Sequence, residues 1–393
     1  MEGSSLDQSH SPVIETRRFV GNAQQAGLSV EELTTISRAA LGQFTVQRLM
    51  AYGLTHADAM ELRGRVGSGE DWQTAAISIA DDLRATLTGN SLPLSRANVL
   101  YRASALMRMA QVMMIEDTEE RQLIFDHASR YFADAARLAG DAVRKEVLTS
   151  YGALLAWVYR PHTDPVGVAI VIGGIEGWAM DFAEMSRWLA QRGVETWAVD
   201  GPGQGESRFR HGHYLHPHWR DVYKELVNHI KQCGMAMPLA VIGSSVGGTL
   251  AFEIAANDPR ISLCVSDGGT VSGSTVLGKQ EATVPKKQMM CGPNFDAEEA
   301  DAIWSDIDVR KVGANLACPV LIIHGQRDPL ICDEEMQEIF SCLASVDKQM
   351  IRFSDGDHCV YNHADDKHIA IADWVAIKLR QVDKAGMSAT VSA

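Results

Sequence analysis

The sequence predicts an α/β fold in which a mostly parallel sheet, covered by helices on both faces, follows an all-helical N-terminal region. Residues from about 15 to 142 show helical periodicity and few strand signals. From residue 143 onward, short apolar runs bounded by Gly, Asp or Pro alternate with helical stretches, as in parallel sheets that are buried on both faces. The 393 residues are 46% hydrophobic and 22% charged, so the chain can bury a large core.

The change from helical periodicity to alternating strand and helix signals divides the chain into segments. We expect a flexible N-terminus over residues 1–14, a helical domain over 15–142, an α/β domain over 143–384 and a flexible tail over 385–393. The tail is expected to fray because its residues are mostly small and polar.

Apolar residues at helical spacing predict the elements of the first domain. Ser95 is expected to cap one helix, and Gly140 is expected to end the next. The predicted helices cover Ser29–Tyr52 (as one or two helices), Trp72–Leu87, Ser95–Ile115 and Asp117–Leu138. Methionines cluster in the Ser95 helix, where they indicate core packing or, alternatively, an adaptable lining for an apolar ligand.

Short apolar runs predict the strands of the second domain. Two neighbouring runs, Glu146–Ser150 and Ala153–Tyr159, are expected to form an antiparallel hairpin at the start of the sheet. The further predicted strands are Val166–Ile172, Val194–Val199, Leu239–Ile242, Ile261–Val265, Val320–His324 and Gln349–Phe353.

Charge and cysteine usage bear on partners and compartment. Lys and Arg number 36 against 50 Asp and Glu, and the resulting net charge of −14 disfavours binding to nucleic acid or anionic membranes. The seven cysteines are odd in number and irregularly spaced, with no C-x-x-C pair, which argues against a disulfide framework. No secretory leader and no apolar stretch of membrane-spanning length is visible. We therefore expect a cytoplasmic protein that binds neither nucleic acid nor a membrane.

The strongest motif is Gly243–Gly247 (GSSVG), which lies between a predicted strand and a helical run. This is G-x-S-x-G in the strand–turn–helix context that places a serine on a strained, exposed turn. The two glycines give the backbone room, and the N-terminus of the following helix stabilises developing negative charge. Ser245 is therefore the candidate nucleophile, and an ordinary Gly/Ser turn is the alternative.

Partners for Ser245 follow in the order Asp, then His. Asp328 comes just after a predicted strand, at the edge where parallel strands end. His358 follows the next strand and would take the serine proton, while Asp328 would orient its imidazole. The rivals are Asp357 for the acid and His363 and His368 for the base.

Two backbone amides are expected to form an oxyanion hole, a site that stabilises negative charge developing during a reaction. The first parallel strand ends in Gly173–Trp178 (GGIEGW), whose paired glycines let the backbone approach a reacting centre. One donor is expected from the amide after the nucleophile, Val246, and the other from Ile175 in this loop. The candidates for lining a substrate pocket here are Gly174, Glu176 and Trp178. For Glu176, surface exposure is the alternative.

Two further segments could suggest a cofactor or a metal. Asp200–Ser207 (DGPGQGES) is rich in glycine but lacks the lysine of a phosphate-binding loop, so a structural turn is the better interpretation. His211–His218 contains four histidines, but no Cys or acidic ligand lies within it and Pro217 interrupts any helix. We therefore expect no metal and no cofactor.

Together these motifs resemble those of the α/β-hydrolases. The helical region, GGIEGW, DGPGQGES and GSSVGG are similar to a narrower group that includes 2,6-dihydroxypseudooxynicotine hydrolase and fungal polyketide-processing hydrolases. The resemblance covers residues from about 15 to 380 and implies a helical cap over a catalytic domain, no cofactor and a homodimer. It carries a catalytic triad to Ser245, Asp328 and His358.

The resemblance also implies an activity. Members of the group cleave a carbon–carbon bond next to a ketone in aromatic or polyketide-like small molecules, in catabolic or secondary-metabolite pathways. The group's nicotine enzyme uses a glutamate after the nucleophile helix, for which Glu281 is the candidate here. The alternatives are an esterase or thioesterase, a cyclase or lyase on the same fold, and a non-catalytic ligand-binding protein, because a fold alone does not decide between them.

Overall fold

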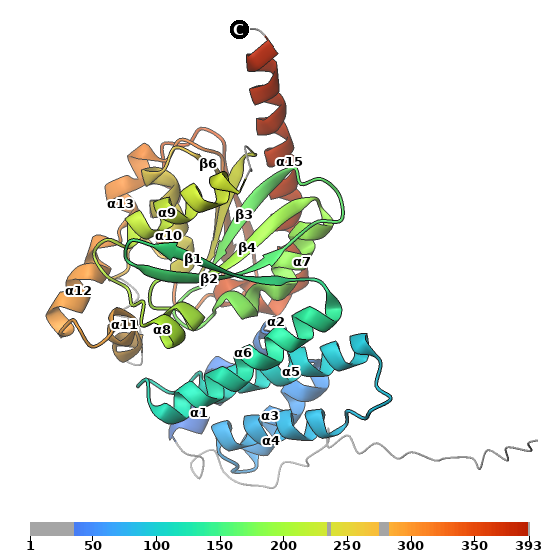
Figure 1. Cartoon of the computed structure of the whole chain (residues 1–393). Helices are drawn as coiled ribbons and strands as arrows, with labels where there is room; N and C mark the ends of the chain where they lie inside the picture. The colour runs from blue at the N-terminus through green and yellow to red at the C-terminus, as the bar shows by residue number, and fades with distance from the viewer. Residues whose placement is uncertain (1–34, 234–236, 275–282, 392–393) are drawn as a thin grey trace, which may run out of the picture.

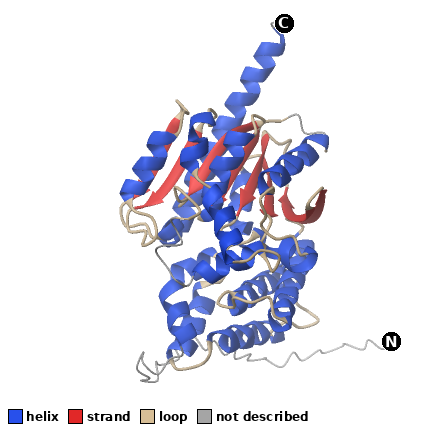
Figure 2. Ribbon diagram, turned by 90° about the vertical axis from the view of Figure 1, so that its left-hand side faces the viewer, coloured by secondary structure: helices blue, strands red, loops and turns tan. Residues whose placement is uncertain are grey.

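An eight-stranded sheet forms the centre of the chain, with helices on both of its faces (Figures 1 and 2). The structure is a computed structural model that describes residues 35–233, 237–274 and 283–391. Glu281 and the predicted N-terminal segment 1–14 lie outside the described residues. Within the described residues, six helices before the sheet form a layer of their own at one end of it (Figure 1). The predicted fold class, with its helical N-terminal region, is therefore confirmed.

The strands agree with the predicted runs to within a few residues. The sheet order is β1-β2-β4-β3-β5-β6-β7-β8, in which β2 is antiparallel to β1 and β4 and all other neighbours are parallel. The strands are β1 (Val143–Thr149), β2 (Gly152–Tyr159), β3 (Gly167–Ile172), β4 (Val194–Asp200), β5 (Leu239–Ser244), β6 (Ile261–Asp267), β7 (Val320–Gly325) and β8 (Lys348–Phe353).

The register brings the carboxyl ends of the central strands to one edge. Ile172 of β3 pairs with Gly243 of β5, and Ser244 of β5 pairs with Asp267 of β6. The loops that follow β3, β5, β6 and β7 therefore start side by side, at the edge where parallel sheets place their functional groups.

Helices pack on the sheet through two apolar layers. One layer joins the sheet to α9 (Trp219–Gln232), α10 (Val246–Asn257) and α14 (Asp333–Cys342). The other joins it to α7 (Ala183–Gln191) and α15 (Ala364–Val391). Because both faces are covered, β3, β4, β5 and β7 are buried along their whole length, which explains why apolar residues predominate in them.

Short elements connect these layers. They are α8 (Gly205–His211), α11 (Thr283–Cys291), α12 (Ala297–Asp306), α13 (Val309–Val312) and the 3-10 helices η2 (Ala179–Phe182), η3 (Gly313–Asn315) and η4 (His358–His363).

The N-terminal helices have a hydrophobic core of their own, which contains Phe44, Leu62 and Trp72. They are α1 (Thr35–Gln43), α2 (Val46–Ala51), α3 (His56–Gly67), α4 (Trp72–Ala85), α5 (Pro93–Gln111) and α6 (Glu119–Ala139). We refer to α1–α6 as the cap helices. Gly140 ends α6 in the left-handed conformation, as predicted.

Two predictions for the cap helices were wrong or incomplete. Ser95 does not cap α5, because the helix starts earlier, with Leu92 at the cap position and Pro93 in the first turn, where the missing N–H of proline costs nothing. Helix α3 was not predicted, although Thr55 and Asp58 form a capping box that marks its start.

The C-terminal end also differs from expectation. Residues 385–391 were predicted as a flexible tail, but α15 continues as a helix to Val391 and extends away from the sheet (Figures 1 and 2). No proline interrupts residues 364–391, so the helix that begins at Ala364 can continue into this stretch.

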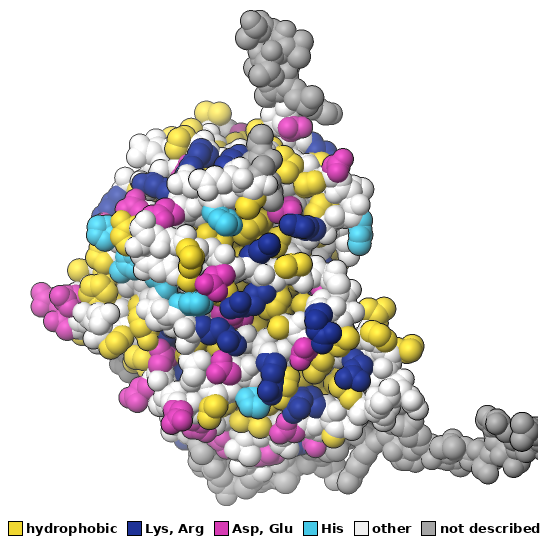
Figure 3. Space-filling view, in the orientation of Figure 1, with side chains coloured by type: hydrophobic (Ala, Val, Ile, Leu, Met, Phe, Trp, Pro, Cys, Tyr) yellow, Lys and Arg dark blue, Asp and Glu magenta, His cyan; other side chains and the backbone are white. Residues whose placement is uncertain are grey.

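The surface mixes charges of both signs. On the face shown in Figure 3, acidic and basic side chains are interspersed, so the net charge of −14 does not form one continuous acidic field there. None of the described helices combines the length and the apolar character that a bilayer crossing requires.

Candidate active site

Ser245 lies at a sharp turn between β5 and α10. Its φ of 56° falls in the left-handed region, which non-glycine residues rarely occupy. The turn fits because Gly243 and Gly247 have no side chains: a Cβ on Gly243 would overlap the backbone of Gly247, and a Cβ on Gly247 would press on the backbone of Gly173. The Ser245 N–H donates to the Asp267 carbonyl at 2.8 Å, which fixes the turn on the sheet.

The structure brings the three residues of the predicted triad together at this turn. Ser245 Oγ lies 2.9 Å from His358 Nε2, and His358 Nδ1 lies 2.8 Å from Asp328 Oδ2. The second oxygen of Asp328 accepts the backbone N–H groups of Leu330 at 2.8 Å and Ile331 at 3.2 Å. With the imidazole proton held on Nδ1 by Asp328, Nε2 is free to accept the serine proton.

The rival residues lie outside this chain of contacts. Asp357 Oδ1 accepts the backbone N–H of Asn362 at 3.2 Å. His363 Nε2 lies 3.0 Å from Asp355 Oδ1, and His368 is buried on α15. The hydrogen-bonded chain therefore runs through His358 and Asp328 alone among these candidates.

His358 is followed by a strained pair of residues that the sequence did not reveal. Cys359 and Val360 have φ values of 53° and 51°, and together with Ser245 they are the non-glycine residues with positive φ in the described part of the chain. Such conformations cost on the order of 1–3 kcal/mol each and persist where the surroundings hold them. Strain is thus concentrated in the two segments that carry the candidate nucleophile and base.

The surroundings of His358 stabilise the positive charge that the imidazole gains when it takes up a proton. Burial lowers the pKa of the imidazole, but the Cys359 thiol and the Asp328 carboxylate outweigh it, so the pKa lies well above the ordinary histidine value. The Cys359 Sγ lies 3.4 Å from His358 Nε2, and Asp328 contacts the opposite side of the ring.

The loop after β3 lies against the nucleophile. A Cβ placed on Gly174 would be only 2.8 Å from the Cβ and 3.3 Å from the Oγ of Ser245, so the backbone makes a close approach that glycine alone permits. The amide of Ile175 belongs to this loop, and that of Val246 starts α10 directly after the nucleophile. Val246 directly follows Ser245, and Ile175 directly follows the glycine that approaches Ser245, so both predicted donors belong to segments that adjoin the nucleophile.

Gln204 sets the orientation of this loop. Its Nε2 donates to the carbonyl oxygens of Gly173 at 2.7 Å and Gly174 at 2.8 Å. Because the C=O and N–H of one planar trans peptide point in opposite directions, holding the Gly174 carbonyl turns the Ile175 N–H away from Gln204. The DGPGQGES segment was predicted as a structural turn only, so this role of its glutamine was missed.

Two glycines of the same loop provide a matched test of this close approach. We expect Gly174→Ala to lower turnover roughly 100-fold, because its methyl group must displace Ser245 by a fraction of an ångström or more. Gly177→Ala is the control, since its Cβ would meet its nearest neighbour, Tyr52, at an ordinary 3.5 Å. Initial rates and urea unfolding of both variants check the prediction, and equal rates would contradict it.

Glu176 ties the loop to the cap helices and to α11. One oxygen accepts from Gln43 and, at 3.1 Å, from Arg48, while the other accepts from Lys286. Burial opposes ionisation, but Lys286 and Arg48 outweigh it and lower the pKa of Glu176 to about 2. The carboxylate is therefore permanently charged and already occupied. The sequence analysis did not predict a role for Gln43, Arg48 or Lys286, because none of them belongs to a motif.

Trp178 is buried rather than displayed. It is 3% exposed, and its ring packs edge-on against Phe125 and Phe209, with centroids 5.7 Å and 5.5 Å away. Together with Ile175 and Glu176 it also borders a cavity of about 10 Å³, large enough for about one water molecule.

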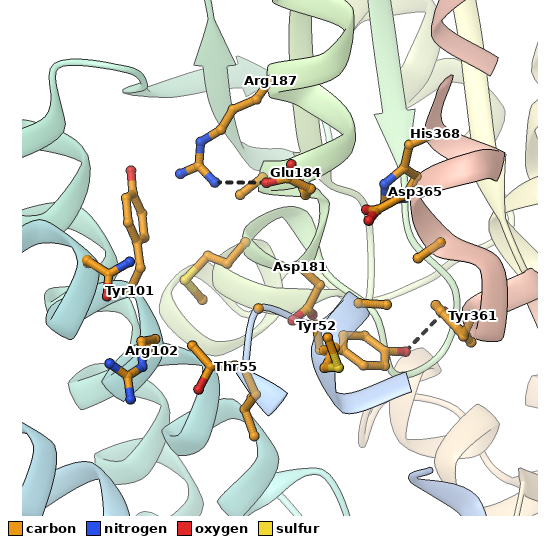
Figure 4. A pocket seen from close by; sticks show the side chains of 18 of the residues that line it. Tyr52, Thr55, Tyr101, Arg102, Asp181, Glu184, Arg187, Tyr361, Asp365 and His368 are labelled. Carbon is orange, nitrogen blue, oxygen red and sulfur yellow. Dashed lines mark hydrogen bonds and ion pairs between the residues drawn. The ribbon is translucent and has the colours of Figure 1, made fainter. Parts of the chain in front are cut away.

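A larger cavity lies between the cap helices and the segments that contain η2, α7, η4 and the start of α15. It has a volume of about 690 Å³ and none of the three triad residues lines it. Tyr52 of the cap helices and Tyr361 of η4 form part of its wall, and their hydroxyl groups lie 3.1 Å apart (Figure 4). Ionisable side chains surround it, including Arg102, Asp181, Glu184, Arg187, Asp365 and His368.

The histidine-rich segment forms no evident metal site. In the ranges that the structure describes, no three His, Cys, Asp or Glu side chains are grouped to hold a metal ion. His213 Nδ1 lies 3.0 Å from the Ala153 carbonyl oxygen, so this ring is engaged by the start of the sheet.

Known proteins resemble this chain in sequence and in fold. The profile of the family described as "Serine aminopeptidase, S33" matches residues 163–295. 2,6-Dihydropseudooxynicotine hydrolase of Paenarthrobacter nicotinovorans is 24% identical over 338 residues, 84% of this chain and 90% of the relative. Hydrolase LUC6 of a Fusarium species is 38% identical over 238 residues, 54% of this chain and 55% of the relative. The solved structure of 2,6-dihydroxy-pseudo-oxynicotine hydrolase superposes with a TM-score of 0.74 at 24% identity, covering 85% of this chain and 96% of that one.

Sheet order, sequence and fold lead to one assignment. The mostly parallel sheet carries a serine turn after β5, and the two relatives named above are both hydrolases. The chain is an α/β-hydrolase that resembles 2,6-dihydropseudooxynicotine hydrolase.

Proposed function

We propose that this hydrolase uses Ser245, His358 and Asp328 as a catalytic triad, without a cofactor, to cleave a carbon–carbon bond next to a ketone. The observation that carries the proposal is the unbroken chain of contacts from Ser245 Oγ through His358 to Asp328, at 2.9 Å and 2.8 Å. The likeness to 2,6-dihydropseudooxynicotine hydrolase over 84% of the chain supports the bond type. The proposed substrate is an aromatic or polyketide-like small molecule.

The geometry supports a covalent route. Ser245 Oγ attacks the ketone carbon while His358 Nε2 takes its proton, and the amides of Ile175 and Val246 stabilise the oxyanion. The carbon–carbon bond then breaks, and the leaving enolate takes the proton from His358. Water, deprotonated by His358, releases the acid from the acyl-enzyme. In a second form of the mechanism, Ser245 only positions a water molecule or the substrate.

Ester or thioester hydrolysis is the second candidate. It develops the same oxyanion on the same carbonyl carbon, so the amides and the triad serve it equally well. What separates the two activities is the leaving group, which is a carbon in one and an oxygen or sulfur in the other.

Product analysis by mass spectrometry tests the proposal. The enzyme and its Ser245→Ala variant are each given an aryl 1,3-diketone, and an ester and a thioester of the same acyl group. We expect diketone cleavage that disappears in the variant. Fast ester or thioester turnover with an intact diketone would overturn the proposed bond type and favour the second candidate.

A further inference from the structure

A buried ion pair lies directly behind the candidate triad. Lys367, near the start of α15, is 2% exposed, and Asp267, the last residue of β6, is 3% exposed. Lys367 Nζ donates to Asp267 Oδ2 at 2.9 Å. Neither residue belongs to a motif, and neither is needed for the chemistry described above.

Asp267 holds the serine turn at two points. Its backbone carbonyl accepts the N–H of Ser245 at 2.8 Å. Its Oδ2 accepts the hydroxyl of Ser244 at 3.2 Å, in addition to the ammonium of Lys367. The position of the nucleophile therefore depends on where Asp267 lies.

Lys367 holds the segment that carries His358. Its Nζ donates to the carbonyl oxygen of Cys359 at 2.6 Å and lies 4.9 Å from the centre of the Tyr361 ring. Cys359 and Val360 are the residues with strained, positive φ. A strained conformation persists only where its surroundings impose it, and this ammonium is one of the groups that do so.

Stability alone is a poor explanation for a charged pair at this place. Removing two charges from water is costly, and apolar side chains of similar size commonly stabilise a core as well or better. Asp267 Oδ1 has no hydrogen-bond partner among the described residues, and burial raises the pKa of Asp267 even though Lys367 lies beside it. The pair joins two segments that the proposed reaction must keep in register, which an apolar pair could not do by hydrogen bonds.

We propose that Lys367 is a positioning residue whose ammonium bridges Asp267 and the Cys359 carbonyl and thereby sets the approach of His358 to Ser245. The proposal rests on the triad of the proposed function. Lys367 touches neither the substrate nor the reacting atoms, so its effect must appear in the reactivity of Ser245 and not in substrate affinity.

The test compares reactivity with stability. The rate at which a serine-directed fluorophosphonate labels Ser245 is measured together with urea unfolding for Lys367→Met, for the double variant Lys367→Met/Asp267→Asn, and for the control Arg220→Met. Arg220 pairs with Glu253, whose side chain is also fully buried, but this pair contacts neither His358 nor the serine turn.

We expect labelling to fall 10- to 100-fold in Lys367→Met, with lower stability because Asp267 is left unpaired. The double variant regains stability, since no uncompensated charge remains, but stays slow because Cys359 still lacks its donor. The control loses stability and keeps its labelling rate. If labelling recovered together with stability in the double variant, Lys367 would be only structural and the proposal would be overturned.

The same experiment separates the two levels of inference. Wild-type protein that is not labelled at Ser245 would overturn the proposed function, and the positioning role with it. Wild-type labelling with an undiminished rate in both Lys367 variants would overturn the positioning role alone.

Discussion

Replacement of Ser245 by alanine is expected to lower turnover by roughly 10³- to 10⁶-fold while the fold stays intact. Alanine keeps the Cβ that already fits the left-handed turn, so the substitution removes only the hydroxyl that lies 2.9 Å from His358. Initial rates and the free energy of unfolding are the two measurements. We expect the first to collapse and the second to change little.

Ser186→Ala is the matched control for this variant. Ser186 is also buried, on α7, and its hydroxyl finds no hydrogen-bond partner in the described part of the chain. Its removal should leave turnover unchanged. Activity of Ser245→Ala within tenfold of the wild type would show that Ser245 is not the nucleophile.

Asp328→Asn is expected to lower turnover by about 10³- to 10⁴-fold. The asparagine amide has the shape of the carboxylate, but its NH₂ can donate to Nδ1 and so stabilise the tautomer that places the proton on Nε2. In that tautomer Nε2 can no longer accept the proton of Ser245. The variant therefore keeps the packing of the site and loses the base.

The pH dependence of the rate gives this prediction a second measurement. The base must be neutral, so the wild-type rate should rise with pH through the raised pKa of His358. Asp328 is one of the groups that raise this pKa, so in Asp328→Asn the rising limb should move to lower pH. The control Asp357→Asn, next to His358 in sequence, should shift neither rate nor limb. A comparable loss in Asp357→Asn would show that the acid had been wrongly assigned.

Much of the site could be predicted because short sequence motifs and the order of the strands determine where its residues lie. The G-x-S-x-G motif places Ser245 at a φ of 56° because the turn has no room for a side chain at Gly243 or at Gly247. Asp328 follows β7 and His358 follows β8, so their proximity to Ser245 is a consequence of parallel strands ending at one edge. These relations connect sequence to position without knowledge of the tertiary packing.

The supporting residues could not be predicted, because their partners are distant in sequence and carry no spacing signal. Arg48 reaches Glu176, and Lys367 reaches Asp267, only after the cap helices and α15 have packed on the sheet. The strain at Cys359 and Val360 was equally hidden, since neither residue type favours positive φ. Ser95 was wrongly predicted as a cap because α5 starts two residues earlier, at Pro93. A proline is well suited to the first position of a helix, so this helix begins without a capping side chain.

The links between the cap helices and the loops beside Ser245 also bear on modularity. Gln43 and Arg48 hold Glu176 next to the Ile175 amide, and Tyr52 meets Tyr361 three residues after His358. An exchange of this helical layer with that of a relative would therefore replace contacts that support the triad loops, not merely the walls of a binding cavity. A chimaera made by recombination, in evolution or in the laboratory, would have to keep Glu176 and Tyr361 together with the cap helices that contact them. We therefore expect the two halves of the chain to be active only in matched combinations.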